Sequence, residues 1–203
     1  SADPRGRVDL LLELGLHKRG VERWDDIWAL ASEARELAES IGYAAGIAGA
    51  LSLQAFALYV HSDYEQALAY AMKGLALAQD NIAAEGKVRL VLSLVHWSIG
   101  NFDEALRHCD RSCAQLRESG DRIEEGFALV VRGGILHSLG EYQQALAAHQ
   151  KSLDIFSAED FSLGIARALA GIGGVLQALG RSEEAHEAHL RSLGLGRSLN
   201  NQM

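Results

Sequence analysis

A short sequence pattern recurs about every 40 residues along this chain, and it constrains the fold more than any other feature. Residues 100–106 read GNFDEAL, residues 140–146 read GEYQQAL and residues 180–186 read GRSEEAH. A related copy, SDYEQAL, occupies residues 62–68, and a degenerate copy, WDDIW, occupies residues 24–28. Such a period is typical of repeat proteins, in which each unit buries its apolar face only by stacking on its neighbours.

Small residues accompany each copy at two fixed distances from the alanine of the pattern or its equivalent. Twelve positions before it stand Gly15, Ala55, Ser93, Gly133 and Gly173. Seven positions after it stand Ala34, Gly74, Ser112, Ser152 and Ser192. Glycine inside a helix costs about 1 kcal/mol relative to alanine, so its recurrence requires a steric reason. We therefore predict that each unit is a pair of helices whose backbones approach closely at these positions.

The small residue in the first helix, the turn, and the aromatic–x–x–Ala–Leu core together resemble the tetratricopeptide repeat. The resemblance covers roughly residues 8–200 and implies an all-α fold, a right-handed α-solenoid of about five helix–turn–helix repeats with about ten antiparallel helices. The predicted organisation is a tag or linker remnant at 1–7, a single solenoid with repeats at about 8–42, 43–81, 82–121, 122–160 and 161–200, and a tail at 201–203.

Two departures from the commonest form of this repeat point to a long-helix variant. The period is about 40 rather than 34 residues. The proline that usually closes the second helix is missing, since Pro4 is the only proline. This variant is similar to bacterial regulatory repeats beside signalling domains such as nucleotide cyclases, and to the repeats of peptide-responsive regulators and spindle-orientation adaptors. The phrase ALAAHQKSL at residues 145–153 is especially like the cyclase-linked group.

In this family the first helices of successive repeats line a concave groove. Carried over position by position, the resemblance implies a partner-binding groove formed by Leu16, Phe56, Tyr59, Leu90, Leu94, Trp97, Phe127, Val130, Gly134 and His137. The alternative is that the aromatic members are core residues shared by adjacent first helices. Gly134, which follows a glycine already explained by packing, either provides a flat groove floor or is simply tolerated in the helix.

The predicted groove is apolar and aromatic, which indicates what it would bind. Family members that grip a peptide carboxylate use cations at these places, whereas the only cations in line here are Lys87 and Arg167. A protein or peptide partner presenting an amphipathic helix or an apolar extended segment is therefore expected. The alternative is a regulatory region of a larger bacterial signalling protein, such as a diguanylate or adenylate cyclase, that acts by dimerisation.

The end of the chain has a bearing on the second alternative. No capping helix follows the fifth repeat, and Gly194 and Gly196 are expected to loosen its second helix. We therefore expect the chain to be cut from a longer protein, or its end to be covered by another subunit, as in a homodimer.

Composition excludes several other classes of partner. The formal net charge is -8, and no basic cluster occurs, so we expect no nucleic-acid binding. No apolar stretch is long enough for a membrane span. The two cysteines, Cys109 and Cys113, form no disulfide framework, which favours a cytoplasmic location.

A metal site and an enzymatic site are both disfavoured by the sequence. His108, Cys109 and Cys113 lie close together on one predicted helix, and Cys109, His149 and His189 share one repeat position. A row of residues on stacked helices does not converge on one ion as zinc requires, so we interpret these residues as packing. The acidic pairs near helix starts are explained by the helix dipole. We expect no cofactor, no metal and no catalysis.

Overall fold

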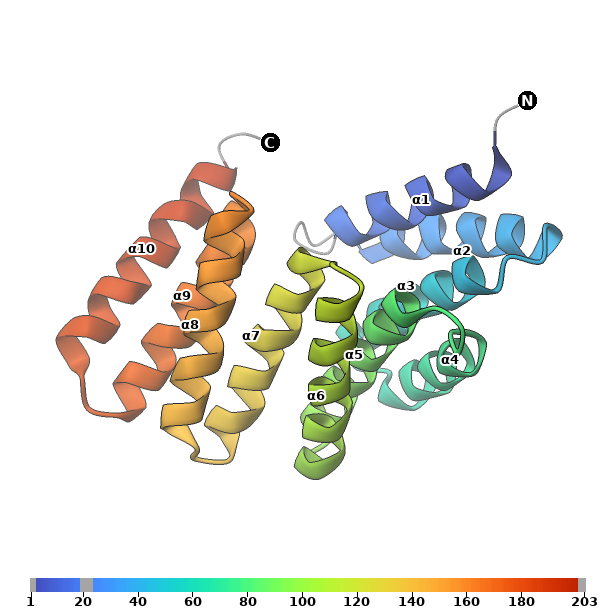
Figure 1. Ribbon diagram of the computed structural model, residues 1–203. Coiled ribbons are helices and arrows are strands. Elements are labelled where there is room, and N and C mark those ends of the chain that lie inside the picture. Colours follow the sequence, from blue (N-terminus) through green and yellow to red (C-terminus); the bar gives the residue numbers. More distant parts are fainter. Residues whose placement is uncertain (1–2, 19–23, 201–203) are drawn as a thin grey trace. The chain divides into compact units, whose positions relative to one another are not determined.

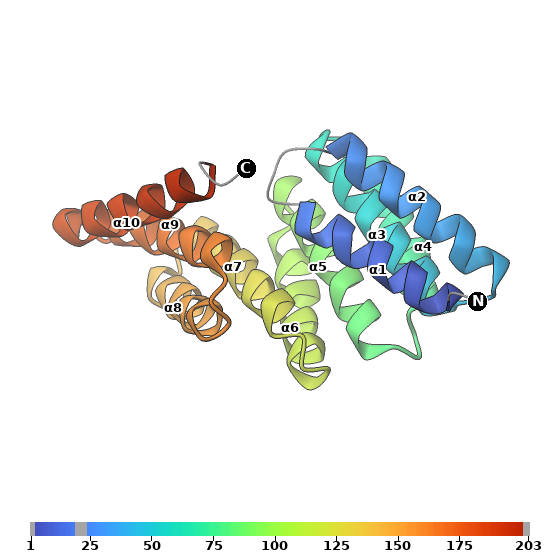
Figure 2. The same ribbon diagram turned by 90° about the horizontal axis from the view of Figure 1, so that it is seen from above.

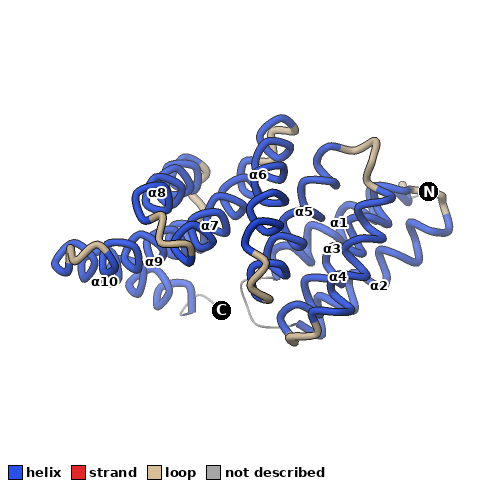
Figure 3. Tube along the Cα trace, turned by 90° about the horizontal axis from the view of Figure 1, so that it is seen from below, coloured by secondary structure: helices blue, strands red, loops and turns tan. Residues whose placement is uncertain are grey.

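The computed structural model describes residues 3–18 and 24–200 (Figure 1). Across these residues the chain forms helices joined by short loops, without a strand (Figure 3). The helices are α1 (Pro4–Lys18), α2 (Trp24–Ser40), α3 (Ala44–Val60), α4 (Tyr64–Leu77), α5 (Ile82–Ser98), α6 (Phe102–Glu118), α7 (Arg122–Ser138), α8 (Tyr142–Ala158), α9 (Ser162–Ala178) and α10 (Ser182–Asn200). The all-α prediction is confirmed, and each repeat is a helical pair. No helix in the described ranges is long and apolar enough to cross a membrane.

The chain divides into two compact units, Ser1–Ser119 and Gly120–Met203, which we call the N-terminal and C-terminal units. Within the N-terminal unit, α3 contacts both α1 and α5. Helix α2 packs against α1 and α3, and helix α4 packs against α3 and α5 (Figure 2). Within the C-terminal unit, α8 packs against α7 and α9, and α10 packs against α9. Each unit thus repeats the packing expected of stacked hairpins, while a single solenoid over residues 8–200 stays a prediction.

The first set of small residues lies where one helix meets the side chains of another. A Cβ atom on Gly15 would lie 2.7 Å from Cδ1 of Leu53, and one on Gly133 would lie 2.5 Å from Nε2 of His149. A Cβ atom on Gly173 would lie 2.6 Å from Cε1 of His189. The steric explanation for these glycines is therefore confirmed.

The second set of small residues has a polar role that the sequence did not reveal. Ser112, Ser152 and Ser192 each donate a hydrogen bond to a backbone carbonyl of the preceding first helix, at Gly86, Gly126 and Ala166, over 2.8, 3.0 and 2.8 Å. Ser112 and Ser152 are fully buried. Each bond joins the two helices of one repeat, and such a bond contributes about 1 kcal/mol to the stability of the fold.

Both ends of the described chain are helical. Residues 4–7, expected to be a tag or linker remnant, belong to α1, with Pro4 in the first turn, where a missing N–H costs nothing. Arg7 also forms a 2.6 Å ion pair with Glu33 of α2. At the other end, α10 continues through Gly194 and Gly196 to Asn200, so the expected loosening of this helix is wrong. The tail at 201–203 lies outside the described residues.

The turns between paired helices explain the glycine that opens the repeated pattern. Gly100 and Gly140 adopt φ values of +80° and +79°, in the left-handed region that side chains disfavour. In the second repeat, Ser62 takes this conformation instead, with φ +62°. Asp63 follows it and accepts a hydrogen bond from the backbone N–H of Gln66 at the start of α4.

Candidate functional site: a cavity on the first helices of the N-terminal unit

A cavity of about 230 Å³ opens between α1, α3 and α5 in the N-terminal unit. Leu12 and Leu16 of α1 line it on one side. Other parts of its wall come from Gly49, Ser52 and Leu53 of α3 and from Ala83, Ala84 and Lys87 of α5. All three helices are the first helices of their repeats. The cavity therefore lies on the helices that the family resemblance assigns to a partner-binding groove.

Small side chains leave the space for this cavity. A Cβ atom on Gly49 would lie 2.8 Å from Cδ1 of Leu12, so a larger residue at that position would push the leucine aside. Leu12 and Leu16 are half-buried, because their inner sides pack against the core formed with α2 and α3. Their remaining surface provides an apolar lining for a ligand.

Charged and polar groups stand around this apolar lining. Asp9 and Glu13 come from α1 and Lys87 from α5, so carboxylates outnumber cations among the described lining residues. The hydroxyl of Tyr43 donates to Oδ1 of Asp9 over 3.1 Å. Burial raises the pKa of Tyr43, and this hydrogen bond raises it further, so the phenol stays protonated at neutral pH. The arrangement suits an apolar segment better than an anionic one.

The predicted groove residues of the N-terminal unit fall into a half-buried group and a buried group. Leu16, which lines the cavity, is half-buried, as are Tyr59, Leu94 and Trp97. Phe56 and Leu90, in contrast, are only 9% and 2% exposed, so their assignment to a groove surface needs correction.

The packing of Phe56 shows the physical reason for this correction. Its ring meets Trp24 edge-to-face at 5.8 Å and Tyr59 at 5.9 Å, which places it inside the core. The alternative interpretation, shared core, is therefore the right one for Phe56.

In the C-terminal unit the same helix positions are mostly engaged in packing. Phe127 meets the buried ring of Phe156 edge-to-face at 5.1 Å, and the guanidinium of Arg167 lies 5.5 Å from the Phe127 ring centre. His137 is half-buried with its ring 5.5 Å from that of Tyr142. Val130 is half-buried as well. Phe127 thus belongs to an aromatic cluster, in agreement with the packing alternative.

Gly134 of α7 is half-buried, and its carbonyl accepts a hydrogen bond from the Ser138 hydroxyl over 3.1 Å. Its assignment to a flat groove floor and its simple tolerance in the helix both stay predictions.

The cysteine and histidine residues that share one repeat position lie in packed interiors. Cys109 is fully buried, and its hydrogen bond with Cys113, together with burial, raises the pKa of its thiol. The His149 ring packs against Gly133 and Gly171, and burial lowers its pKa to about 4. A protonated thiol and a buried neutral ring agree with the packing interpretation of both residues.

Sequence reasoning missed part of the cavity wall and one cluster of side chains. Asp9, Tyr43 and Ala83 line the cavity but were not among the predicted groove residues. The cluster joins His96 of α5 to Glu104 and His108 of α6. The four-residue spacing between Glu104 and His108 was visible in the sequence, but the approach of His96 required the fold.

Comparison with known proteins agrees with this architecture. The sequence profile of the tetratricopeptide repeat family matches residues 87–158 and 127–198, which together exceed half of the chain. The chain belongs to the tetratricopeptide repeat family. Among curated proteins, none matches its sequence.

Several solved structures share the fold at low sequence identity. A Rap protein complexed with Competence and Sporulation Factor superposes with a TM-score of 0.78 and 16% identity, over 97% of this chain and 55% of that one. BtubC from P. vanneervenii gives a TM-score of 0.69 and 13% identity, over 97% and 89% of the two chains. A STAND signal-transduction ATPase with a tetratricopeptide repeat sensor, from Pyrococcus horikoshii, gives 0.70 and 18%, over 95% and 30%. The chain thus spans about half of the Rap protein and less than a third of the ATPase.

Proposed function

We propose that this chain is a non-catalytic protein-interaction module and that the cavity between α1, α3 and α5 receives an apolar anchor of a peptide or helix from its partner. The cavity itself carries the proposal, because it combines an apolar lining from Leu12 and Leu16 with the charged groups of Asp9, Glu13 and Lys87. Sites for ligands are typically concave, mostly apolar and supplied with a few polar groups that orient the ligand.

Two further observations support this proposal. Tetratricopeptide repeats are typical protein-interaction modules, and the chain belongs to that family. The Rap protein with the same fold was solved in complex with Competence and Sporulation Factor. A partner with one apolar side chain buried in the cavity and a basic group beside Asp9 and Glu13 would match the charges at the site.

Filling the cavity tests the proposal. Ala83 lines the cavity and is half-buried, so Ala83→Trp would place an indole in the space that the anchor needs. We expect peptides selected from a phage-displayed random library against the unaltered chain to bind the Ala83→Trp variant at least about tenfold more weakly, a loss of about 1.4 kcal/mol. Fluorescence anisotropy with labelled selected peptides measures this change.

A matched variant separates blocking of the cavity from general damage. Ala76 is exposed on α4 and does not line the cavity, so Ala76→Trp should bind the same peptides as the unaltered chain does. Equal affinity of the unaltered chain and the Ala83→Trp variant would contradict the proposal, provided that circular dichroism shows both to be equally helical.

A second candidate function is that of a regulatory region that dimerises within a larger signalling protein. The exposed leucines of α10, Leu190 at 55% and Leu193 at 58%, favour it, because they leave apolar surface on the last described helix. A STAND ATPase carries repeats of this fold as a sensor. Multi-angle light scattering tests the candidate: we expect a dimer that Leu190→Glu with Leu193→Glu converts to a monomer. A monomer before substitution would exclude it.

A further inference from the structure

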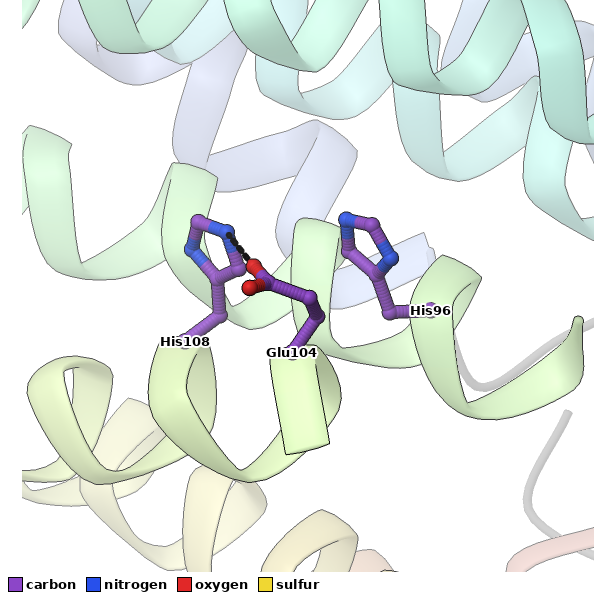
Figure 4. A group of neighbouring side chains, drawn as sticks. All are labelled: His96, Glu104 and His108. Atoms are coloured by element: carbon purple, nitrogen blue, oxygen red, sulfur yellow. Dashed lines mark ion pairs between the residues drawn. The ribbon is translucent and has the colours of Figure 1, made fainter. Parts of the chain in front are cut away.

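Three side chains with metal-binding chemistry meet where α5 turns into α6 (Figure 4). His96 lies in the last turns of α5, and Glu104 and His108 lie one turn apart near the start of α6. Their potential ligand atoms all lie within 4.8 Å of one another. Nε2 of His108 is 3.8 Å from Oε2 of Glu104, and the rings of His96 and His108 stack in parallel with their centres 5.6 Å apart.

Only the third repeat has histidine, glutamate and histidine at these three positions, so the packing of a repeat does not require this combination. The equivalent residues are Lys18, Asp26 and Leu30 in the first repeat, Leu58, Gln66 and Tyr70 in the second, Leu136, Gln144 and Ala148 in the fourth, and Leu176, Glu184 and Ala188 in the fifth. Apolar or small residues are therefore sufficient for packing at the two histidine positions.

The first repeat shows what these positions do when the second helix carries a carboxylate. Lys18 and Asp26, the equivalents of His96 and Glu104, form an ion pair with 2.8 Å between Nζ and Oδ2. The geometry therefore places a cation from the end of the first helix beside the carboxylate of the second. In the third repeat the first helix offers a neutral imidazole instead of an ammonium group.

The two imidazoles are in the form that binds metals. Burial lowers the pKa of His96, and burial together with the Arg107 charge lowers that of His108 to about 4, so both rings are neutral at pH 7. Nδ1 of His96 is buried and has no hydrogen-bond partner within the described structure. Neutral imidazole nitrogens with a free lone pair are common metal ligands.

Two arginines also face this cluster and oppose a bound cation. The Arg107 guanidinium pairs with Glu104 and approaches Nε2 of His108 to 3.5 Å. Arg89 approaches Nδ1 of His108 to 3.5 Å, but its Nη2 forms a 2.5 Å ion pair with Oε1 of Glu85. The Arg107 side chain is 48% exposed, so it can turn into solvent and release Glu104.

We propose that His96, Glu104 and His108 bind one zinc ion per chain at the turn between α5 and α6. Two imidazole nitrogens and one carboxylate oxygen form a three-residue zinc ligand set, and water completes the tetrahedral coordination. The ion would join the two helices of the third repeat as Lys18 and Asp26 join those of the first. The site differs from the set formed by His108, Cys109 and Cys113 on α6, because it includes His96 of α5.

Isothermal titration of the chelator-treated chain with zinc chloride tests this proposal. We expect one zinc ion to bind per chain, and His96→Leu or His108→Ala, which install the residues of the fourth repeat, to weaken binding at least about tenfold each. Because these residues occur naturally at equivalent positions, both variants should fold. Arg107→Gln should tighten binding, since it removes the charge that competes for Glu104.

A histidine outside the cluster provides the control. His61 is exposed at the turn after α3, and His61→Ala should leave zinc binding unchanged. The proposal would be overturned if the unaltered chain bound no zinc, or if His96→Leu and His108→Ala bound it as tightly as the unaltered chain. An equal loss of zinc binding in His61→Ala and in His96→Leu would also overturn the proposal, because it would indicate that zinc binds to dispersed surface histidines rather than to this cluster.

Discussion

Replacing Gly133 with alanine should destabilise the C-terminal unit by about 2 to 3 kcal/mol, although alanine is the better helix former. A Cβ atom at Gly133 would stand 2.5 Å from Nε2 of His149. The ring has little room to retreat, because Gly171 of α9 lies so close to it that a Cβ atom there would stand 2.4 Å from Cε1 of His149. The added methyl group therefore forces α7 and α8 apart.

A glycine in open space provides the matched comparison. Gly174 of α9 has no atom within 4 Å of its hypothetical Cβ atom, so Gly174→Ala should stabilise the protein by about 0.5 to 1 kcal/mol through the lower entropy of the unfolded chain. Urea unfolding followed by circular dichroism measures both effects. If Gly133→Ala unfolded at the same urea concentration as the unaltered chain, the close approach of α7 to His149 would be refuted.

Acidification should weaken the C-terminal unit well before its carboxylates titrate. Burial lowers the pKa of His149 to about 4, whereas an exposed histidine has a pKa of about 6.5. In the unfolded chain His149 therefore binds a proton below about pH 6.5, whereas in the folded chain it does so only below about pH 4. The free energy of unfolding should fall by about 2 kcal/mol from pH 6.5 to pH 5, and by about 3 kcal/mol by pH 4.

Removing His149 should remove its part of this dependence. His149→Cys installs the residue that the third repeat carries at the equivalent position, Cys109, and a thiol stays neutral throughout this range. In urea titrations the variant should lose about 2 kcal/mol less than the unaltered chain between pH 6.5 and pH 5, while His108, whose pKa burial also lowers to about 4, keeps its own contribution. His186→Ala, at an exposed position of α10, is the control and should keep the dependence of the unaltered chain. The same slope in His149→Cys would assign the pH dependence to other groups.

Much of the architecture was predictable from the sequence, because the relevant signals are local. The pattern at residues 100–106 and 140–146 combines a left-handed turn position with an amphipathic helix start, and both are properties of a short segment. Gly133 and Gly173 recur because each lies where the first helix of its repeat meets a histidine ring of the second helix. Helical pairs and their spacing therefore followed from periodicity alone.

The site was only partly predictable. Leu16 lines the cavity, whereas Phe56 and Leu90 lie in the core. The repeat position of a residue predicts where it lies along its helix. Whether its side chain faces a groove or a neighbouring helix depends on a small rotation of the helix about its axis. Sequence spacing does not contain that rotation, so the aromatic residues could not be sorted in advance.

By itself, the sequence determined the family, the helical pairs and the places where helices touch, because steric and conformational demands repeat within each short unit. The tertiary structure decided which of two adjacent glycines is confined, which bonds Ser112 and Ser152 form, and where a cavity opens. It also brought His96 of α5 to Glu104 and His108 of α6. Each of these outcomes depends on how two helices are rotated against one another, and that rotation is set by the packing of side chains from both.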